Sequence, residues 1–473
     1  MTKSFKLAVS LLFFFSVTSV IRAIDVGGTL AADTVWSPAL GTVTVVANLT
    51  VPAGLKLTVA AGTQVRVTNN MAILIQAGGT LDIAGTEESP VSVLYLGTGR
   101  WLAVNASGNN SVVTVRHAEF SRGGIIVGSQ STLLVEDSYL HDLVTAIEAD
   151  NARSATLRRI HVSNYDETIF NGTLTLAEDS LFENMSSAND DALELQGAPS
   201  GCEIRRCTFR HSTGSNSDAF DCNGSLQVFV HDCLFYDIND KGISFGTATA
   251  YNQTPSTGMV VSNCLIYYCG TGLAVKDKST ASIYNCTLVG SPYGIRLYEK
   301  YAPPGGGSGI GGQITNGFDN IIWANTNVNA LVASNSAMYL TYSDVGGTNA
   351  PGIGNLNIDP LFANAAARDY RLSDASPLLH AGINGGPLGA HFPVGAPMAP
   401  SHPTISSVQV DGGDCVLRFW VDEGKPYRVE SSDSVRGGVW QKVADIPAQS
   451  LPRRLSVTNA IAAPRQFYRL TTP

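Results

Sequence analysis

The chain has few charged residues and none of the common nucleotide motifs, which excludes several functional classes. Only 15% of its 473 residues are charged, and the formal net charge is -9. No basic run of five or more residues occurs, which argues against nonspecific binding of nucleic acid. Phosphate-binding loops, dinucleotide fingerprints and HExxH sequences are also absent. We therefore expect neither a nucleic-acid partner nor a nucleotide cofactor.

The middle of the chain lacks the apolar spacing of helices and instead repeats a six-residue phrase. The copies begin at Val115, Val135, Leu157, Ala177, Ile204, Val230, Val261, Ile283 and, in the drifted form FDNIIW, Phe318. The third letter is mostly polar, whereas the fourth and sixth are mostly small or apolar. The third therefore lies at a bend and the other two face inward. A repeat of this length built from short strands predicts a β-solenoid with one coil per repeat.

A second short strand follows most copies and begins with a small residue. These residues are Gly124, Ala146, Ala192, Ala219, Gly242, Gly272 and Gly294, with a less regular copy around Ile169. Two strands per coil, joined by polar turns, predict an all-β chain whose main domain is a right-handed parallel β-helix.

Residues 24–393 resemble the pectin lyase-like superfamily of right-handed parallel β-helices. NLTVPAGLKLTVAAGTQVRV is similar to the first coils of secreted bacterial members, and DPLFANAAARDYRLSDASPLLHAG to their last coil. SDAFDCNGS, DKGISFG and GLAVKDKSTASI resemble bacterial β-helix domains whose activity is generally unassigned. The resemblance thus implies a fold and leaves the chemistry open.

The N-terminus has the pattern of a secretory signal. Lys3 and Lys6 precede an apolar run over residues 7–20, which is short for a membrane span. We expect cleavage near Ala23, a secreted or cell-surface protein, and no membrane span after cleavage. A retained membrane anchor is the alternative.

A Pro- and Gly-rich linker at residues 394–403 precedes a small C-terminal domain. Residues 404–473 contain short alternating strands separated by turns, which predict a small antiparallel β-sandwich. This domain resembles C-terminal modules that end in a phrase like FYRL, which are candidate adhesion or export domains. We expect the whole protein to be a monomer.

The eight cysteines are expected to be structural thiols. Cys207, Cys233, Cys264 and Cys286 share the inward fourth position of the phrase, where parallel side chains give poor disulfide geometry. Cys202 is the strongest candidate for a disulfide with a neighbour. No CxxC pair occurs, so nothing supports a zinc site.

The outward positions of the second strand carry a strip of charged residues. Two residues after the small letter stand Glu148, Glu194, Asp221, Ser244, Ala274 and Arg296, and just before it stand Asp191, Asp218 and Lys241. Carboxylates stacked about 5 Å apart repel one another unless a cation lies among them. Asp191, Glu194, Asp218 and Asp221 could therefore bind Ca²⁺.

Two cleavage chemistries fit this strip. In a polysaccharide lyase, a Lys or Arg removes a proton beside a uronate carboxylate, and Lys276, Lys278 and Arg296 are the candidate bases, with Lys241 a further candidate catalytic residue. A hydrolase would use Asp191 and Asp218. The residues NDD, SD, DKG and LAVK resemble, in order, the NTD, DD, GHG and RIK motifs of polygalacturonases. Ser217, Lys241 and Ala274 depart from those motifs, and the loss of one carboxylate puts inverting hydrolysis in doubt.

We therefore expect an exported protein that binds an extracellular polysaccharide, with lyase or hydrolase cleavage left open. The rival is a noncatalytic surface or adhesion protein that uses the solenoid as a rigid scaffold. In an enzyme, the charged residues should converge in one groove walled by the turns at residues 247–257 and 301–312. In a scaffold, they should lie along a flat, open face.

Overall fold

A computed structural model describes residues 23–96, 103–106, 108–347, 349–396, 405–411, 414–421, 425–434, 439–448, 453–461 and 466–472. The chain divides into two compact units, residues 1–396 and 397–473. The helices in the described ranges are short 3₁₀ turns, η1 (Pro38–Leu40), η2 (Ala365–Ala367) and η3 (Pro377–His380). None of these is long or apolar enough to cross a membrane. The predicted signal lies outside the described residues, except Ala23, where β1 begins.

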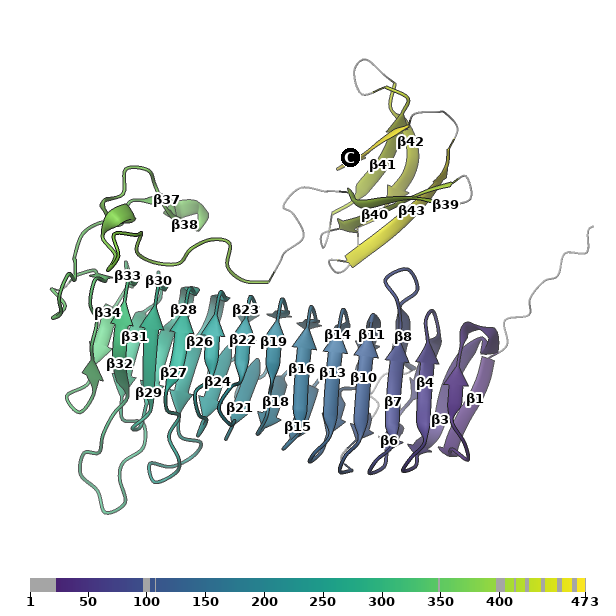
Figure 1. Ribbon diagram of the computed structural model, residues 1–473, viewed down its shortest axis with the longest axis horizontal. Helices are drawn as coiled ribbons and strands as arrows, with labels where there is room; N and C mark the ends of the chain where they lie inside the picture. Colours follow the sequence, from purple (N-terminus) through teal and green to yellow (C-terminus); the bar gives the residue numbers. More distant parts are fainter. Residues whose placement is uncertain are drawn as a thin grey trace, which may run out of the picture. The chain divides into compact units, whose positions relative to one another are not determined.

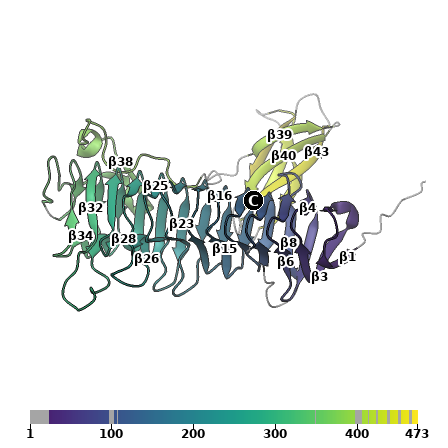
Figure 2. The ribbon, with the colours of Figure 1, turned by 60° about the horizontal axis from the view of Figure 1, so that its bottom comes forward.

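The first unit is a parallel β-solenoid whose coils stack along one axis (Figures 1 and 2). A regular coil has three strands, where the sequence predicted two. The difference arises because the six-residue phrase contains a corner: its first letters end one strand and its last letters begin the next. Strands of neighbouring coils pair in parallel, which buries one continuous core between three sheets.

Sheet 1 follows the first letters of each phrase. It consists of β2 (Thr34–Trp36), β4 (Lys56–Ala60), β7 (Thr80–Ala84), β10 (Val112–Arg116), β13 (Thr132–Glu136), β16 (Ser154–Arg158), β19 (Leu176–Glu178), β22 (Glu203–Arg205), β25 (Phe229–His231), β27 (Met259–Ser262), β29 (Thr280–Tyr284), β32 (Gln313–Phe318) and β35 (Ala337–Met338).

Sheet 2 follows the corner. It consists of β1 (Ala23–Thr29), β3 (Thr42–Val51), β5 (Gln64–Thr68), β8 (Val91–Leu96), β11 (Ala118–Ser121), β14 (Tyr139–His141), β17 (His161–Ser163), β20 (Leu181–Glu183), β23 (Thr208–Ser212), β26 (Leu234–Gly246), β28 (Leu265–Lys276), β30 (Thr287–Val289), β33 (Ile321–Trp323) and β36 (Asp344–Val345).

Sheet 3 carries the charged strip. It consists of β6 (Ala72–Ile75), β9 (Ala103–Ala106), β12 (Ile125–Val127), β15 (Thr145–Asp150), β18 (Glu167–Asn171), β21 (Leu193–Gln196), β24 (Phe220–Asn223), β31 (Tyr293–Tyr298) and β34 (Val328–Val332). The long strands β3, β26 and β28 continue from sheet 2 into sheet 3.

The third letter of the phrase turns the corner in a left-handed backbone conformation, as its polarity predicted. In the eight regular copies this residue has a φ between 44° and 57°. The residues are His117, Asp137, Arg159, Asp179, Arg206, Asp232, Asn263 and Asn285. Asn and Asp tolerate this conformation better than branched residues do, which explains their frequency here.

The drifted phrase at Phe318 was aligned one residue out of register. Asp319, with a φ of 59°, turns the corner, and Ile321 pairs with Thr287. Asn320, and not Ile321, therefore occupies the fourth position. The error arose because an Asn at the third letter and an Ile at the fourth suit the pattern as well as the true alignment.

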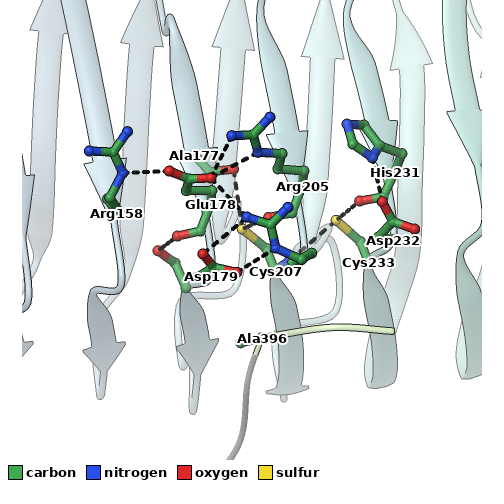
Figure 3. Close-up of polar contacts among 12 residues, drawn as sticks. Arg158, Ala177, Glu178, Asp179, Arg205, Cys207, His231, Asp232, Cys233 and Ala396 are labelled. Carbon is green, nitrogen blue, oxygen red and sulfur yellow. Dashed lines mark hydrogen bonds and ion pairs between the residues drawn. The ribbon is translucent and has the colours of Figure 1, made fainter. Parts of the chain in front are cut away.

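The fourth letters stack in one column inside the solenoid, and polar atoms in the column accept backbone hydrogen bonds. Cys233 Sγ lies 3.5 Å from the backbone N of Cys207, and Asn320 Oδ1 lies 3.0 Å from that of Cys286. Figure 3 shows Cys207 and Cys233 on neighbouring coils. All eight cysteines are free and buried, so the disulfide suggested for Cys202 is wrong. Small side chains with one acceptor atom suit this column, because neighbouring coils leave no space for larger side chains.

Stacked aromatic rings fill part of the solenoid core, and a C-terminal tail covers some of its corners. Phe209 stacks on Phe182 and Phe235 with ring centroids 4.8 and 4.9 Å away. After the antiparallel pair β37 (Phe362–Asn364) and β38 (Asp369–Leu372), residues 388–396 run back along the corners of earlier coils. Ala396 N, at the end of this tail, donates to Thr208 Oγ1 at 2.9 Å.

The second unit contains two small antiparallel sheets. One consists of β39 (Ile405–Asp411), β40 (Asp414–Val421) and β43 (Arg453–Ala460), and the other of β42 (Gln441–Ile446), β41 (Tyr427–Ser432) and β44 (Phe467–Thr471). Leu417 and Phe419 from one sheet and Tyr427 and Val429 from the other form a shared apolar core. A core between two sheets is the arrangement of a β-sandwich.

Candidate functional site

The register of sheet 3 places the predicted charged residues on neighbouring coils. Glu194 on β21 pairs with Asp221 on β24, and Asp221 pairs with Ser244 on β26. The same column continues through Ala274 to Arg296. Parallel strands in register bring residues far apart in sequence to neighbouring positions about 4.8 Å apart.

Asp191, Asp218 and Lys241 form a second row, held by side-chain hydrogen bonds to the backbone. Asp191 Oδ1 accepts from the backbone N of Asp218 at 2.7 Å. Asp218 Oδ1 accepts from the backbone N of Lys241 at 3.1 Å and from its Nζ at 3.0 Å. Lys241 Nζ also pairs with Asp240. Each carboxylate is therefore fixed by the next coil.

Three of the predicted metal ligands meet in one cluster. Asp191, Glu194 and Asp221 each offer a carboxylate oxygen, and these oxygens lie within 4.8 Å of one another. We call these three residues the carboxylate cluster. Asp218, the fourth predicted ligand, is not part of this group, and one of its oxygens is engaged by Lys241.

Lys276 reaches the carboxylate cluster from two coils away because Gly246 leaves space for it. Lys276 Nζ lies 3.6 Å from Asp221 Oδ1, and the Lys side chain is only 3% exposed. A Cβ at Gly246 would lie 2.7 Å from Lys276 Cε, so any larger residue would displace the lysine. The absence of a side chain at Gly246 thus lets the Lys276 ammonium group pair with Asp221.

The environment moves the pKa values of the clustered carboxyl groups in opposite directions. Burial, together with the charges of Asp221 and Asp218, holds the pKa of Asp191 well above its usual value. Burial and the charge of Asp221 also raise the pKa of Glu194. Burial opposes ionisation of Asp221 too, but Lys276, Lys241 and the hydrogen bonds of Ser244 and Asn223 together outweigh it and lower the pKa of that carboxyl. The pKa values of Asp191 and Asp221 therefore move apart.

Asp218 and the two lysines titrate outside their ordinary ranges. Burial raises the pKa of Asp218 to about 6, although the charge of Lys241 opposes the shift. Burial lowers the pKa of Lys241, but Asp218 and Asp240 more than compensate and raise it above its usual value. The pKa of Lys276 is likewise raised by Asp221 and Asp218 against the effect of burial. Both lysines therefore remain protonated at neutral pH.

Arg296 does not join the carboxylate cluster. Its guanidinium lies over the rings of Tyr298 and Tyr293, at 4.4 and 5.3 Å from their centroids. Ser244 and Ala274 separate it from Asp221 in the column. Of the five predicted catalytic residues, the structure thus brings together Asp191, Asp218, Lys241 and Lys276, and leaves Arg296 apart.

A shallow polar groove of about 570 Å³ runs beside the carboxylate cluster. One side is lined by the amides Asn151, Asn171, Gln196 and Asn223, where strands of sheet 3 end, and the other by the loop at residues 248–254. We call it the amide groove. The sequence analysis missed Asn151, Asn171 and Gln196, although Gln196 lies just two residues after Glu194 and could have been found from the same alignment.

The two long turns expected to form walls contact each other. Tyr251 Oη accepts from the backbone N of Ile310 at 2.8 Å, and Tyr301 Oη donates to the carbonyl of Ala248 at 3.2 Å. Lys278 Nζ lies 4.4 Å from the centroid of the Tyr251 ring. Only the first of these turns lines the amide groove.

Comparisons with known proteins identify the fold and no activity. Residues 168–303 match the family model of the right handed beta helix region. This stretch includes the carboxylate cluster and both lysines. No curated protein matches the chain. The solenoid is therefore a right-handed parallel β-helix, consistent with a protein of the pectin lyase-like superfamily.

Proposed function

We propose that the protein is exported, binds an extracellular polysaccharide across sheet 3 and hydrolyses it at the carboxylate cluster. The observation that carries the proposal is the geometry of Asp191 and Asp221: their carboxylate oxygens lie within 4.8 Å of each other, and Lys276 pairs with Asp221, which favours a proton on Asp191 and a negative charge on Asp221. Glycoside hydrolysis needs one carboxyl that keeps its proton beside one that stays ionised. In this proposal Asp191 gives its proton to the leaving oxygen while Asp221 attacks the anomeric carbon, and a water molecule deprotonated by Asp191 then releases the sugar from Asp221.

The spacing of the cluster favours a retaining reaction over an inverting one. Retaining glycosidases hold their two carboxyl groups about 5 Å apart, whereas inverting enzymes leave about 6.5–9.5 Å for a water molecule. The departure at Ser217 from the polygalacturonase-like pattern removes a carboxylate of an inverting site. It does not affect a pair made by Asp191 and Asp221.

Elimination is less well supported because the candidate bases are protonated. Lys241 and Lys276 are held as ammonium ions by Asp218 and Asp221, and a proton acceptor must be neutral. Arg296 lies apart from the carboxylate cluster, over the rings of Tyr298 and Tyr293. A lyase reaction would need one of these ion pairs to open first.

The carboxylate cluster also fits a Ca²⁺ ion. Asp191, Glu194 and Asp221 supply the hard oxygen ligands that Ca²⁺ prefers. Asp221 Oδ1 lies 3.6 Å from Lys276 Nζ, so a Ca²⁺ ion would share this carboxylate with the ammonium group or displace it. Calcium requires Asp191 to be ionised, whereas hydrolysis requires its proton, so the two states compete.

Calcium should therefore stabilise the protein and inhibit it. We expect millimolar Ca²⁺ to raise the melting temperature, to slow hydrolysis, and to lose both effects when EDTA is added. Asp191→Asn should abolish hydrolysis and the calcium-dependent rise in melting temperature. Asp25→Asn, at an exposed position on β1, is the matched control and should change neither.

A screen of the purified protein against polysaccharides, with and without Ca²⁺, tests the proposal. New reducing ends without absorbance from unsaturated products would support hydrolysis. Unsaturated products would instead show elimination and overturn the assigned chemistry. Binding without cleavage would leave a noncatalytic binding protein, and no binding to any glycan would favour the scaffold role.

A further inference from the structure

The amide groove is built almost entirely from uncharged polar groups, although it adjoins a strongly charged cluster. Its lining consists of Asn, Gln, Gly, Thr and Ala residues, with no charged or aromatic side chain among them. Asn171, Gln196 and Asn223 pair in register on β18, β21 and β24, so their amides form a row along the solenoid axis. A linear ligand in the groove would contact several coils in turn.

Neighbouring carboxylates determine which way these amides point. Asn171 Nδ2 donates to Asp150 Oδ1 at 2.7 Å, and Gln196 Nε2 donates to Glu194 Oε1 at 2.8 Å. Asn223 Nδ2 donates to Asp221 Oδ2 at 2.5 Å. An ionised carboxylate can only accept hydrogen bonds, so each amide must turn its NH₂ group toward it. The row therefore retains its carbonyl oxygens as acceptors for a ligand.

The amide of Asn223 shows this most clearly. Its side chain is 7% exposed, and its Oδ1 accepts no hydrogen bond within the described part of the chain. A buried acceptor without a donor is unfavourable, and a ligand hydroxyl would satisfy this oxygen once the Asn223 side chain turns toward the groove.

Glycines after the amides keep the groove free of side chains. Gly172, Gly197 and Gly224 follow Asn171, Gln196 and Asn223 and have φ values of 108°, 62° and 63°. A Cβ at Gly197 would meet nothing within 4 Å. Gln253 Oε1 accepts from the backbone N of Thr249 at 2.6 Å, which fixes the loop that lines the groove.

We infer that the amide groove binds a neutral, hydroxyl-rich glycan chain that lies along the solenoid axis. Sugar hydroxyl groups supply the donors that a row of carbonyl oxygens requires. A polyuronate fits less well, because no cationic side chain lines the groove to pair with its carboxylates and Asp150 lies beside Asn171. This inference rests on the proposed function and specifies its class of substrate.

Isothermal titration of the full chain with cellohexaose, xylohexaose, mannohexaose and polygalacturonate tests the inference. We expect at least one neutral hexaose to bind and polygalacturonate to bind at least tenfold more weakly. Asn171→Ala combined with Gln196→Ala should lower the affinity for that hexaose at least tenfold, because two hydrogen bonds are lost. Gln64→Ala, at an exposed position on β5, is the control and should bind as the unaltered protein does.

The outcomes separate this inference from the proposed function. Binding of polygalacturonate in preference to the neutral hexaoses would overturn the inference and leave polysaccharide binding intact. Neutral binding that the double variant retains, with an unchanged melting temperature, would also overturn it, because the ligand would lie elsewhere. Failure of every glycan to bind would reject both.

Discussion

At the scale of single residues, ion pairs between coils contribute most to the stability of the solenoid where the charged groups are buried. Figure 3 shows one example, in which Glu178 contacts Arg158 and Arg205 from the coils on either side. Glu183 is a second, with its side chain 3% exposed and paired to His161 and Arg210, at 2.7 and 2.6 Å. Exposed ion pairs contribute little, but removing one partner of a buried pair leaves an uncompensated charge.

Glu183→Gln should therefore destabilise the solenoid by about 2–3 kcal/mol at neutral pH. Burial opposes ionisation of Glu183, but His161 and Arg210 outweigh it and lower its pKa to about 2. A lowered pKa gives stability that is present above about pH 5 and is lost as the pH falls toward 2. Urea unfolding at pH 7 and pH 3 checks this. The difference from the unaltered protein should shrink at the lower pH, and a constant difference would contradict the ionic explanation.

The cysteine column makes a separate prediction about size and polarity. Cys233 Sγ lies at 3.5 Å from the backbone N of Cys207, and Ser180 fills the equivalent place two coils before Cys233 with an Oγ acceptor. Cys233→Ser should cost less than about 1.5 kcal/mol, whereas Cys233→Leu should cost about 1–3 kcal/mol or more through overpacking. Thermal melts of both variants check this. Equal losses would show that the column does not select for size.

At the scale of elements, the solenoid is regular in its strands and variable in its turns. Sheets 1 to 3 repeat with matching registers, whereas the turn at residues 299–312 is long and held by side chains. Glu299 accepts from the backbone N of Gly309 and from Asn335 Nδ2, both at 2.6 Å. The length of such a turn can vary without changing the core, so turns of this kind can shape the surface beside a site.

Tyr251→Phe should loosen the two long turns without affecting the coils. The change removes the hydroxyl that accepts from Ile310 N and keeps the ring that packs on Gly309. Hydrogen exchange at the Ile310 amide should accelerate by about tenfold, since one hydrogen bond contributes about 0.5–1.5 kcal/mol. The melting temperature should stay within about 2 °C. Unchanged exchange at Ile310 would show that the hydroxyl does not hold the turns together.

At the scale of the whole molecule, opposing titrations set the pH of greatest stability. Glu178 and Glu183 have pKa values lowered to about 2, because Arg158, Arg205, His161 and Arg210 outweigh the effect of burial. Their contribution is lost as the pH falls below about 4.5. Burial raises the pKa values of Asp218 and Asp344 to about 6, so their contribution is present below about pH 4 and is lost as the pH rises toward 6.

The protein should therefore be most stable near pH 4–5. Thermal melts from pH 2 to pH 8 in low-calcium buffer test this expectation. Asp344→Asn should flatten the decline between about pH 4 and 6, because it removes one buried group that must ionise there. A stability maximum at or above pH 7 would contradict the predicted balance.

The repeated phrase by itself determined the solenoid. Its polar third letter and apolar fourth and sixth letters suffice because parallel strands alternate their faces and like positions stack on successive coils. The alignment also predicted the order of Glu194, Asp221 and Ser244 along sheet 3. The alignment failed at Phe318, where two adjacent residues suit the same position. It also predicted two strands per coil instead of three, because the corner between two strands lies inside the phrase.

Only the tertiary structure decided which charged residues meet. Sequence order placed Arg296 in the same column as Asp221, but in the structure two other coils lie between them and Arg296 stacks on tyrosines. The Lys276 side chain passes over Gly246 to reach Asp221. This contact is possible because Gly246 has no Cβ atom. Side-chain direction, burial and the resulting pKa values depend on contacts between coils. The distances between side chains on neighbouring coils cannot be read from the order of residues in the sequence.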